Sequence, residues 1–194
     1  MGSGLRVLID VDDVCGEFIE EVLRWYDIDF EDYLELSDIK EWDILNYIKD
    51  QAKPMFHDYF RNAQLYTRVR PVEGALENIQ KILDLGCDVF YCTAVVSGAE
   101  GIKYNWLVKN GFIKDEHDPK KYYVEISEKY ILDGVNAVLV DDGFHNLELF
   151  KGSRILFKRP WNERQYRETE LPMIRTNNWN EIYNVIKELT LTLK

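Results

Sequence analysis

Three carboxylates follow an apolar run near the start of the chain, and their types and spacing suit them to chemistry. Residues 5–9 are rich in branched apolar side chains, as in a buried strand of a parallel sheet, and Asp10, Asp12 and Asp13 come next. Residues two apart share one face of an extended chain, so the Asp10 and Asp12 carboxylates can converge. Because close carboxylates repel each other, a hard divalent cation such as Mg²⁺ is expected between them. A solvated acidic turn is the alternative.

Two later apolar stretches end in polar side chains in the same way. Residues 88–92 are followed by Thr93, and residues 136–140 are followed by Asp141 and Asp142. Active sites in open α/β sheets lie just beyond the carboxyl ends of the strands. The sequence therefore predicts that these three polar residues gather at the edge of the sheet where the first carboxylates lie.

The chemistry that suits this set of groups is phosphoryl transfer. Lys103 lies on the predicted helix after the second strand. A carboxylate can attack phosphorus when a cation and a lysine screen its repulsion from the phosphate dianion. Water then hydrolyses the aspartyl-phosphate, and a second carboxylate can protonate the leaving alkoxide and later activate that water. We therefore expect a phosphatase.

Length and composition narrow the class of protein. The 194 residues are enough for one domain, or one domain with an insertion, and 46% hydrophobic with 30% charged residues is ordinary for a globular protein. The formal net charge of −11 argues against a nucleic-acid polymer as partner, because phosphate backbones require a basic surface. A small phosphorylated substrate is still allowed if its site is locally neutralised.

The cysteines and the hydropathy pattern predict a cytoplasmic protein. Cys15, Cys87 and Cys92 form no CxxC pair, which favours a reducing compartment and no structural zinc. No apolar run approaches the ~20 residues of a membrane span, so no membrane association is expected. The first residues lead directly into the first predicted strand, so no signal peptide is expected.

Strands alternate with helices along most of the chain, which predicts an α/β fold with a doubly wound parallel sheet. Besides the three strands above, the pattern predicts strands at 154–157 and, weakly, 122–126, and helices at 14–26, 75–85, 98–110, 144–150 and 179–189. Between the first helix and Tyr66 the chain is acidic and aromatic, with short helical patterns, one with Ser37 as its N-cap and one near residues 54–60. We interpret residues 14–70 as a small helical cap inserted after the first strand, and residues 1–13 and 71–194 as the α/β core.

The polar residues at the ends of the predicted strands, together with Lys103, resemble the motifs of a known family. Asp10-Val11-Asp12-Asp13-Val14, Thr93, Lys103 and Asp141-Asp142 are similar to the four motifs of the haloacid-dehalogenase (HAD) superfamily of phosphatases, which implies a HAD-like Rossmannoid core. Further segments resemble the 5′(3′)-deoxyribonucleotidase branch: Pro71-Val72-Glu73-Gly74-Ala75, Cys92-Thr93, Lys103-Tyr104-Asn105-Trp106, Leu139-Val140-Asp141-Asp142, Arg154-Ile155-Leu156-Phe157 and Asn178-Trp179-Asn180-Glu181-Ile182. The resemblance covers nearly the whole chain and is weakest over residues 27–66.

The resemblance implies roles for the acidic residues. Asp10 would be the nucleophile and a metal ligand. Asp12 would be the general acid/base and would give its backbone carbonyl to the Mg²⁺. Asp142 aligns best with a direct metal ligand, which leaves Asp141 to support it or to act through water.

The resemblance also implies a phosphate site, with two departures from the family pattern. Thr93 and Lys103 would bind and neutralise the phosphate. Ala94 stands where the nucleotidases usually have serine, so a hydroxyl contact is lost while the backbone N–H can still donate. Asp13 stands where the family usually has glycine, which adds negative charge beside the metal. Both departures leave the identity of the substrate open.

Several other residues have two interpretations. Phe18 and Tyr66 are candidates for stacking on a nucleotide base, with a plain packing contact as the alternative for each. Residues 158–162 follow the fourth strand at the correct end of the sheet, but we predict a solvated charged loop there. No metal-ligand spacing links the three histidines, which are expected to be solvated or packed: His57, His117 and His145.

Together these observations predict a Mg²⁺-dependent phosphomonoesterase that hydrolyses (deoxy)ribonucleoside monophosphates through an aspartyl-phosphate on Asp10. Two alternatives stay open. One is a HAD phosphatase for another small phosphoester, such as a sugar phosphate. The other is a catalytically degenerate HAD-fold protein with a binding or regulatory role. The expected partner is a small nucleotide, and a homodimer is the candidate assembly.

Overall fold

The computed structural model describes residues 4–114 and 122–192, and the strands in these ranges form one parallel six-stranded sheet. The strand order is β3-β2-β1-β4-β5-β6. The strands are β1 (Arg6–Ile9), β2 (Asp88–Thr93), β3 (Tyr123–Glu125), β4 (Ala137–Asp141), β5 (Ser153–Phe157) and β6 (Ile174–Thr176). The predicted parallel α/β sheet is confirmed, and the prediction missed only the short edge strand β6 among these strands.

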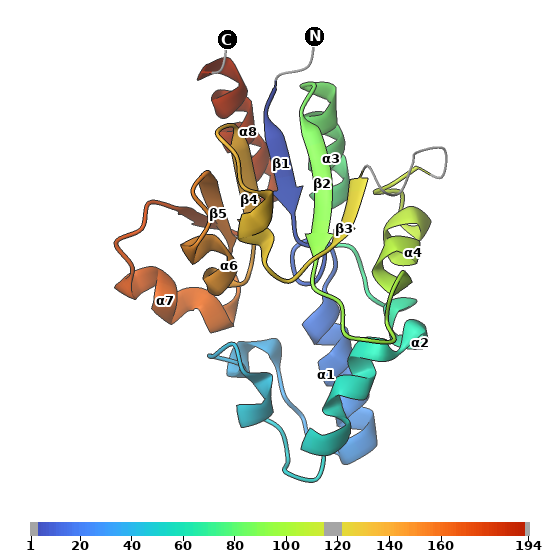
Figure 1. Ribbon diagram of the computed structural model, residues 1–194. Coiled ribbons are helices and arrows are strands. Elements are labelled where there is room, and N and C mark those ends of the chain that lie inside the picture. The colour runs from blue at the N-terminus through green and yellow to red at the C-terminus, as the bar shows by residue number, and fades with distance from the viewer. Residues whose placement is uncertain (1–3, 115–121, 193–194) are drawn as a thin grey trace.

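Alternating side chains of the central strands enter two separate apolar layers. Val7 and Ile9 of β1 belong to the larger buried cluster, whereas Leu8 between them belongs to a second cluster. Helices α3 (Ala75–Asp84), α4 (Ile102–Lys109) and α8 (Trp179–Thr192) contribute to the first layer, and α6 (Phe144–Glu148) contributes to the second. Such burial on both faces is the reason that these strands are apolar along their whole length, and it gives the doubly wound arrangement (Figure 1).

A helical segment connects β1 to the rest of the core and lies beyond the carboxyl ends of the strands (Figure 1). It contains α1 (Phe18–Phe30), the 3₁₀ helices η1 (Leu36–Asp38), η2 (Ile44–Asn46) and η3 (Lys53–Arg61), and α2 (Ala63–Tyr66). The expected N-cap at Ser37 is wrong, because η1 is capped by Glu35. Phe56 of this segment and Ile9 of β1 belong to one buried cluster, so the apolar core is continuous between them. The boundaries of the cap, residues 14–70, stay a prediction.

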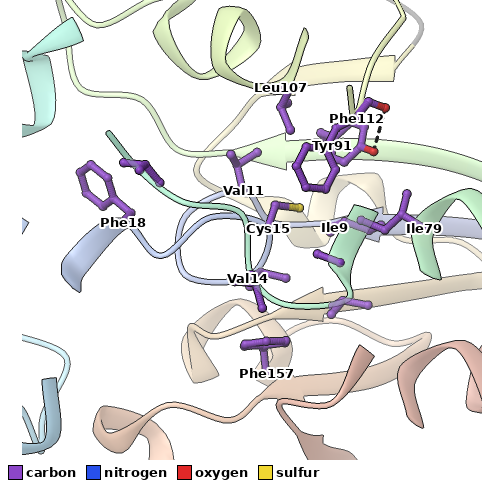
Figure 2. Close-up of a cluster of buried hydrophobic side chains, with 14 of the residues drawn as sticks. Ile9, Val11, Val14, Cys15, Phe18, Ile79, Tyr91, Leu107, Phe112 and Phe157 are labelled. Carbon is purple, nitrogen blue, oxygen red and sulfur yellow. Dashed lines mark hydrogen bonds between the residues drawn. The ribbon is translucent and has the colours of Figure 1, made fainter. Parts of the chain in front are cut away.

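The loop between β1 and α1 is anchored in the core, so α1 begins four residues later than predicted. Val11, Val14 and Cys15 are buried beneath this loop (Figure 2). Gly16 packs closely against Val69, because a Cβ placed on Gly16 would lie 2.8 Å from Val69 Cγ1. The backbone of Asp13 has φ of 56°. This left-handed residue ends the extended conformation, and the chain changes direction in the loop after Asp10.

The remaining elements follow strands β3 and β5 along the chain. They are η4 (Lys129–Leu132), η5 (Pro160–Asn162) and α7 (Glu163–Glu168). None of the helices in the described ranges combines the length and apolar character that a membrane crossing requires.

Candidate active site

An acidic cluster lies where β1 and β4 end side by side. Ile9 pairs with Val140 in the parallel register, which places Asp10 beside Asp141 and Asp142. Each of these three buried residues offers a carboxylate oxygen, and the three oxygens lie within 4.8 Å of one another. Carboxylate oxygens are the ligands that hard divalent cations prefer. The cluster therefore fits a divalent metal ion such as Mg²⁺.

The carboxylates of this cluster are buried and repel one another. Burial raises the pKa of Asp142 well above its ordinary value, and the neighbouring Asp141 and Asp10 raise it further. Burial also raises the pKa of Asp141. A bound divalent cation would offset this repulsion, because an adjacent positive charge favours the ionised form of a carboxylate.

The Asp12 side chain faces a different set of partners, and its role as a metal ligand through the backbone carbonyl stays a prediction. Among the described residues, the three-carboxylate cluster does not include Asp12, so the cation expected between Asp10 and Asp12 fits better beside Asp141 and Asp142. The turn after β1 carries the Asp12 side chain toward Lys103, whose Nζ is 2.7 Å from Asp12 Oδ2. The alternation that we expected to align both carboxylates ends with the strand at Ile9.

The phosphate-binding candidates gather around Asp12. Lys103 Nζ donates to Thr93 Oγ1 at 2.8 Å and also to the Ala94 carbonyl. Tyr66 donates its phenolic O–H to both Asp12 oxygens at 3.2 Å. Burial raises the pKa of Asp12, and the nearby Lys103 opposes that shift. The structure thus brings Asp12, Thr93, Ala94 and Lys103 together as the sequence suggested.

Lys129 is a second buried lysine, and the sequence analysis missed it. Its Nζ lies 2.8 Å from Asp10 Oδ2 and 2.6 Å from Asp141 Oδ2. Burial lowers the pKa of Lys129, but these two carboxylates outweigh burial and raise it above its ordinary value. Its position just after β3, at the active edge of the sheet, was the available signal. Lys129 holds a fixed positive charge against the candidate nucleophile.

Asp13 does not belong to the metal cluster. Its carboxylate accepts the backbone N–H of Ile19 at 3.2 and 3.3 Å and so caps the first turn of α1. Its backbone carbonyl accepts from Arg159 Nε at 2.8 Å. Burial raises the pKa of Asp13 to about 8, although Arg159 opposes the shift. The left-handed backbone is the conformation that glycine adopts most easily, which accounts for the glycine that the resembled family usually carries here.

A pocket of about 430 Å³ opens above these groups, and its two ends differ in chemistry. The floor, at the carboxyl ends of the strands, holds Asp10, Asp12, Asp142 and both lysines. The opposite wall is apolar and aromatic and comes from the helical segment: Ile19, Ile39, Trp42, Ile44 and Phe60. The pocket can therefore hold a molecule with one anionic end and one apolar end.

Phe18 and Tyr66 line this pocket and also pack on each other. Their rings are stacked with centroids 4.9 Å apart, and Phe60 meets Phe18 edge-on at 5.1 Å. Both side chains are almost completely buried. The packing interpretation is thus present in the structure, and base stacking stays a prediction.

The histidines differ in their surroundings. His145 lines the pocket and meets the ring of Trp42 edge-on at 4.7 Å, and burial lowers its pKa. His57 lies near the Phe60 ring. His117 lies outside the described residues.

The expectation of a solvated loop at residues 158–162 is wrong for three of its members. Arg159, Trp161 and Asn162 are buried. Trp161 Nε1 donates to Asp142 Oδ2 at 2.9 Å, and Asn162 Nδ2 donates to the Asp142 backbone carbonyl at 2.8 Å. No local pattern marked these residues, because their partner lies on a neighbouring strand.

Known sequences similar to this chain carry one consistent description. The sequence model of the family described as "5′ nucleotidase, deoxy (Pyrimidine), cytosolic type C protein" matches residues 4–192. The chain is 29% identical over 182 residues to a 5′(3′)-deoxyribonucleotidase of Bacillus subtilis, which covers 91% of this chain and 95% of that protein. It is 28% identical to a 5′(3′)-deoxyribonucleotidase of Clostridium acetobutylicum, over 89% of each chain.

Solved structures with the same fold include HAD hydrolases. A HAD family hydrolase from Deinococcus radiodurans, with bound phosphate and sodium, superposes with a TM-score of 0.66 at 16% identity over 96% of each chain. A HAD hydrolase from Bacillus subtilis, bound to magnesium, gives a TM-score of 0.59 at 15% identity over 94% of this chain and 98% of that one. At such identities the likeness shows the fold.

Proposed function

Because this chain belongs to the family of 5′ nucleotidase, deoxy (pyrimidine), cytosolic type C proteins, and is a HAD-type phosphatase, we propose that it hydrolyses deoxyribonucleoside monophosphates with Mg²⁺. The reaction proceeds through an aspartyl-phosphate on Asp10. The observation that carries this proposal is the two-ended pocket, with an acidic and basic floor below an apolar and aromatic wall.

The apolar wall favours a nucleoside over a sugar as the leaving group. A nucleobase buries a flat, largely apolar face, which Trp42, Phe60 and three isoleucines can cover. A sugar phosphate would instead place several hydroxyl groups against this wall, and each would lose hydrogen bonds to water without replacement. Sugar phosphates are therefore the weaker substrates in this proposal.

Asp10 is the proposed nucleophile. One of its oxygens accepts the Val11 N–H at 2.7 Å and the other accepts from Lys129, so the carboxylate is held in one orientation. When Mg²⁺ is bound by Asp10 and Asp142, with Asp141 in support, it supplies positive charge that neutralises the phosphate. The Asp10 oxygen forms a bond to phosphorus while the bond from phosphorus to the nucleoside oxygen breaks.

Asp12 is the proposed general acid and base. Its raised pKa allows it to carry a proton at a pH where an ordinary aspartate is ionised, and it gives this proton to the leaving nucleoside oxygen. In the second step it removes a proton from the water that attacks phosphorus and releases Asp10. Lys103 and Thr93 hold the remaining phosphate oxygens.

The degenerate alternative is less well supported. The candidate nucleophile, the second carboxylate, the phosphate-binding groups and the metal-binding carboxylates all lie around one pocket. For a protein that bound no metal ion, the buried and mutually repelling carboxylates would cost stability without a benefit. A cytoplasmic location and a homodimer stay predictions, the first resting on the buried cysteines Cys15, Cys87 and Cys92.

Release of inorganic phosphate tests the proposal. The panel contains deoxyribo- and ribonucleoside monophosphates and sugar phosphates, each with Mg²⁺ and with EDTA. We expect release from deoxyribonucleotides with Mg²⁺, and none with EDTA or with Asp10→Asn, which should stay folded by circular dichroism. An active Asp10→Asn enzyme would refute the nucleophile, and release from sugar phosphates alone would refute the substrate class.

A further inference from the structure

Asp142 receives a hydrogen bond from a residue outside the motif set. Its carboxylate is buried, and Oδ2 accepts the indole N–H of Trp161 at 2.9 Å. Asp141, by contrast, accepts from Lys129, from the Gly143 backbone N–H and from Asn146. The orientation of the Asp142 carboxylate therefore depends more on this one donor than the orientation of Asp141 depends on any one of its three donors.

The turn that carries Trp161 is held in place by the side chain of Asn162. Asn162 donates to the carbonyls of Asp142 and Phe157, both at 2.8 Å, and its side-chain oxygen accepts from the Arg159 N–H and from Arg175 Nε. Both N–H groups of this amide donate and its oxygen accepts twice, so its hydrogen-bonding groups are all used. The indole thus starts from a backbone that is fixed to Asp142 itself.

The ring of Trp161 is also held by apolar packing. It forms a buried cluster with Leu23 of α1 and Ile39 of the helical segment. The indole N–H faces the Asp142 carboxylate, and the ring packs with residues of the helical segment that covers the pocket. A side chain fixed by packing on one side can hold a carboxylate in one rotamer on the other.

From these contacts we propose that Trp161 is a positioning residue for the metal site: it occupies Oδ2 of Asp142 and leaves the other oxygen for the divalent cation. The inference rests on the proposed function in that it takes Asp142 as a metal ligand. Groups that orient metal ligands in this way are typically worth about 10- to 100-fold in metal affinity or activity.

Calorimetric titration of the substrate-free protein with MgCl₂ tests the role of the indole N–H. Trp161→Phe keeps an aromatic ring but removes the donor. Incorporation of 3-benzothienylalanine at position 161 removes the donor and keeps the shape of the ring. We expect about tenfold weaker Mg²⁺ binding in both variants, with kcat restored at saturating Mg²⁺. Unchanged Mg²⁺ affinity in the benzothienylalanine variant would overturn the inference.

Two further variants separate positioning from packing and from the metal site itself. Leu23→Ala loosens the same cluster without touching the hydrogen bond, so it should lower the melting temperature and leave Mg²⁺ affinity unchanged. An equal loss of affinity in Leu23→Ala would overturn the inference in favour of packing. Asp142→Asn should weaken binding more than either Trp161 variant. If Asp142→Asn binds Mg²⁺ as tightly as the parent protein does, the assigned metal site is wrong and the inference is overturned. If the parent protein binds Mg²⁺ but releases no phosphate, the proposed function alone is rejected.

Discussion

Replacement of Lys129 by methionine should destabilise the metal-free protein more than most single substitutions. Met keeps the length of the side chain and removes its charge. Lys129 is 2% exposed, and its ammonium group contacts both Asp10 and Asp141. The variant leaves two buried carboxylates without their positive partner.

The expected magnitude follows from the two contacts. At an effective dielectric constant of 20, each pair at 2.8 or 2.6 Å is worth about 6 kcal/mol before desolvation is subtracted. Most of that attraction only offsets the cost of burying three charges. Removal of one partner of a buried ion pair typically costs about 3–5 kcal/mol, and that is the loss we expect in the free energy of unfolding. Because the orphaned carboxylates can take up a proton, the loss should shrink as the pH is lowered toward 5.

Urea unfolding in EDTA, followed by circular dichroism at pH 7, measures this loss. Lys103→Met is the matched control, because Lys103 contacts one carboxylate and lies at the pocket. It should lose less stability than Lys129→Met. Added Mg²⁺ should stabilise Lys129→Met more than the parent, since the cation replaces the missing charge. A Lys129→Met protein within about 1 kcal/mol of the parent in EDTA would refute the buried charge bridge.

Two more predictions concern the groups around Asp12 and Asp13. Tyr66→Phe keeps the stack on Phe18 but loses the hydrogen bonds to Asp12. In steady-state kinetics, kcat should therefore fall by about tenfold with little change in KM. A change in KM alone would contradict this prediction. Asp13 has its folded-state pKa raised to about 8 from an ordinary 3.8, so its favourable contribution is complete below pH 4 and is lost as the pH rises through 8. Asp13→Asn, measured by urea unfolding in EDTA, should therefore gain stability relative to the parent from pH 5 to pH 8, and parallel pH profiles would contradict the burial of this carboxyl group.

The strands that carry the site could be predicted because they are buried on both faces. Continuous apolar runs marked β1, β2, β4 and β5, and each run ended close to a polar group of the site. The short strand β6 escaped detection because three residues at the edge of a sheet need no apolar run.

The residues that the sequence analysis missed depend on tertiary contacts. Lys129 lies beside the nucleophile because it follows the carboxyl end of β3, a three-residue strand whose alternation in the sequence is weak. Trp161 meets Asp142 through a turn whose hydrogen bonds come from Arg159 and Arg175. Neither contact leaves a periodic or compositional signal in the sequence, and the position of Lys129 just after a weakly predicted strand was the one indication of its role.

The position of β1 in the middle of the sheet has a consequence for how the protein folds. The two strands that pair with β1 come much later in the chain. Strand β2 follows the long helical segment, and β4 comes later still. Pairings between segments so distant in sequence slow folding, because loop-closure entropy is lost before the contacts form. During synthesis, β1 waits for its partners, and Asp10 cannot meet Asp142 until most of the chain has left the ribosome. Tight metal binding would then report that β4 has joined β1, and a nascent chain that stops before β4 would bind the ion no better than an unfolded one.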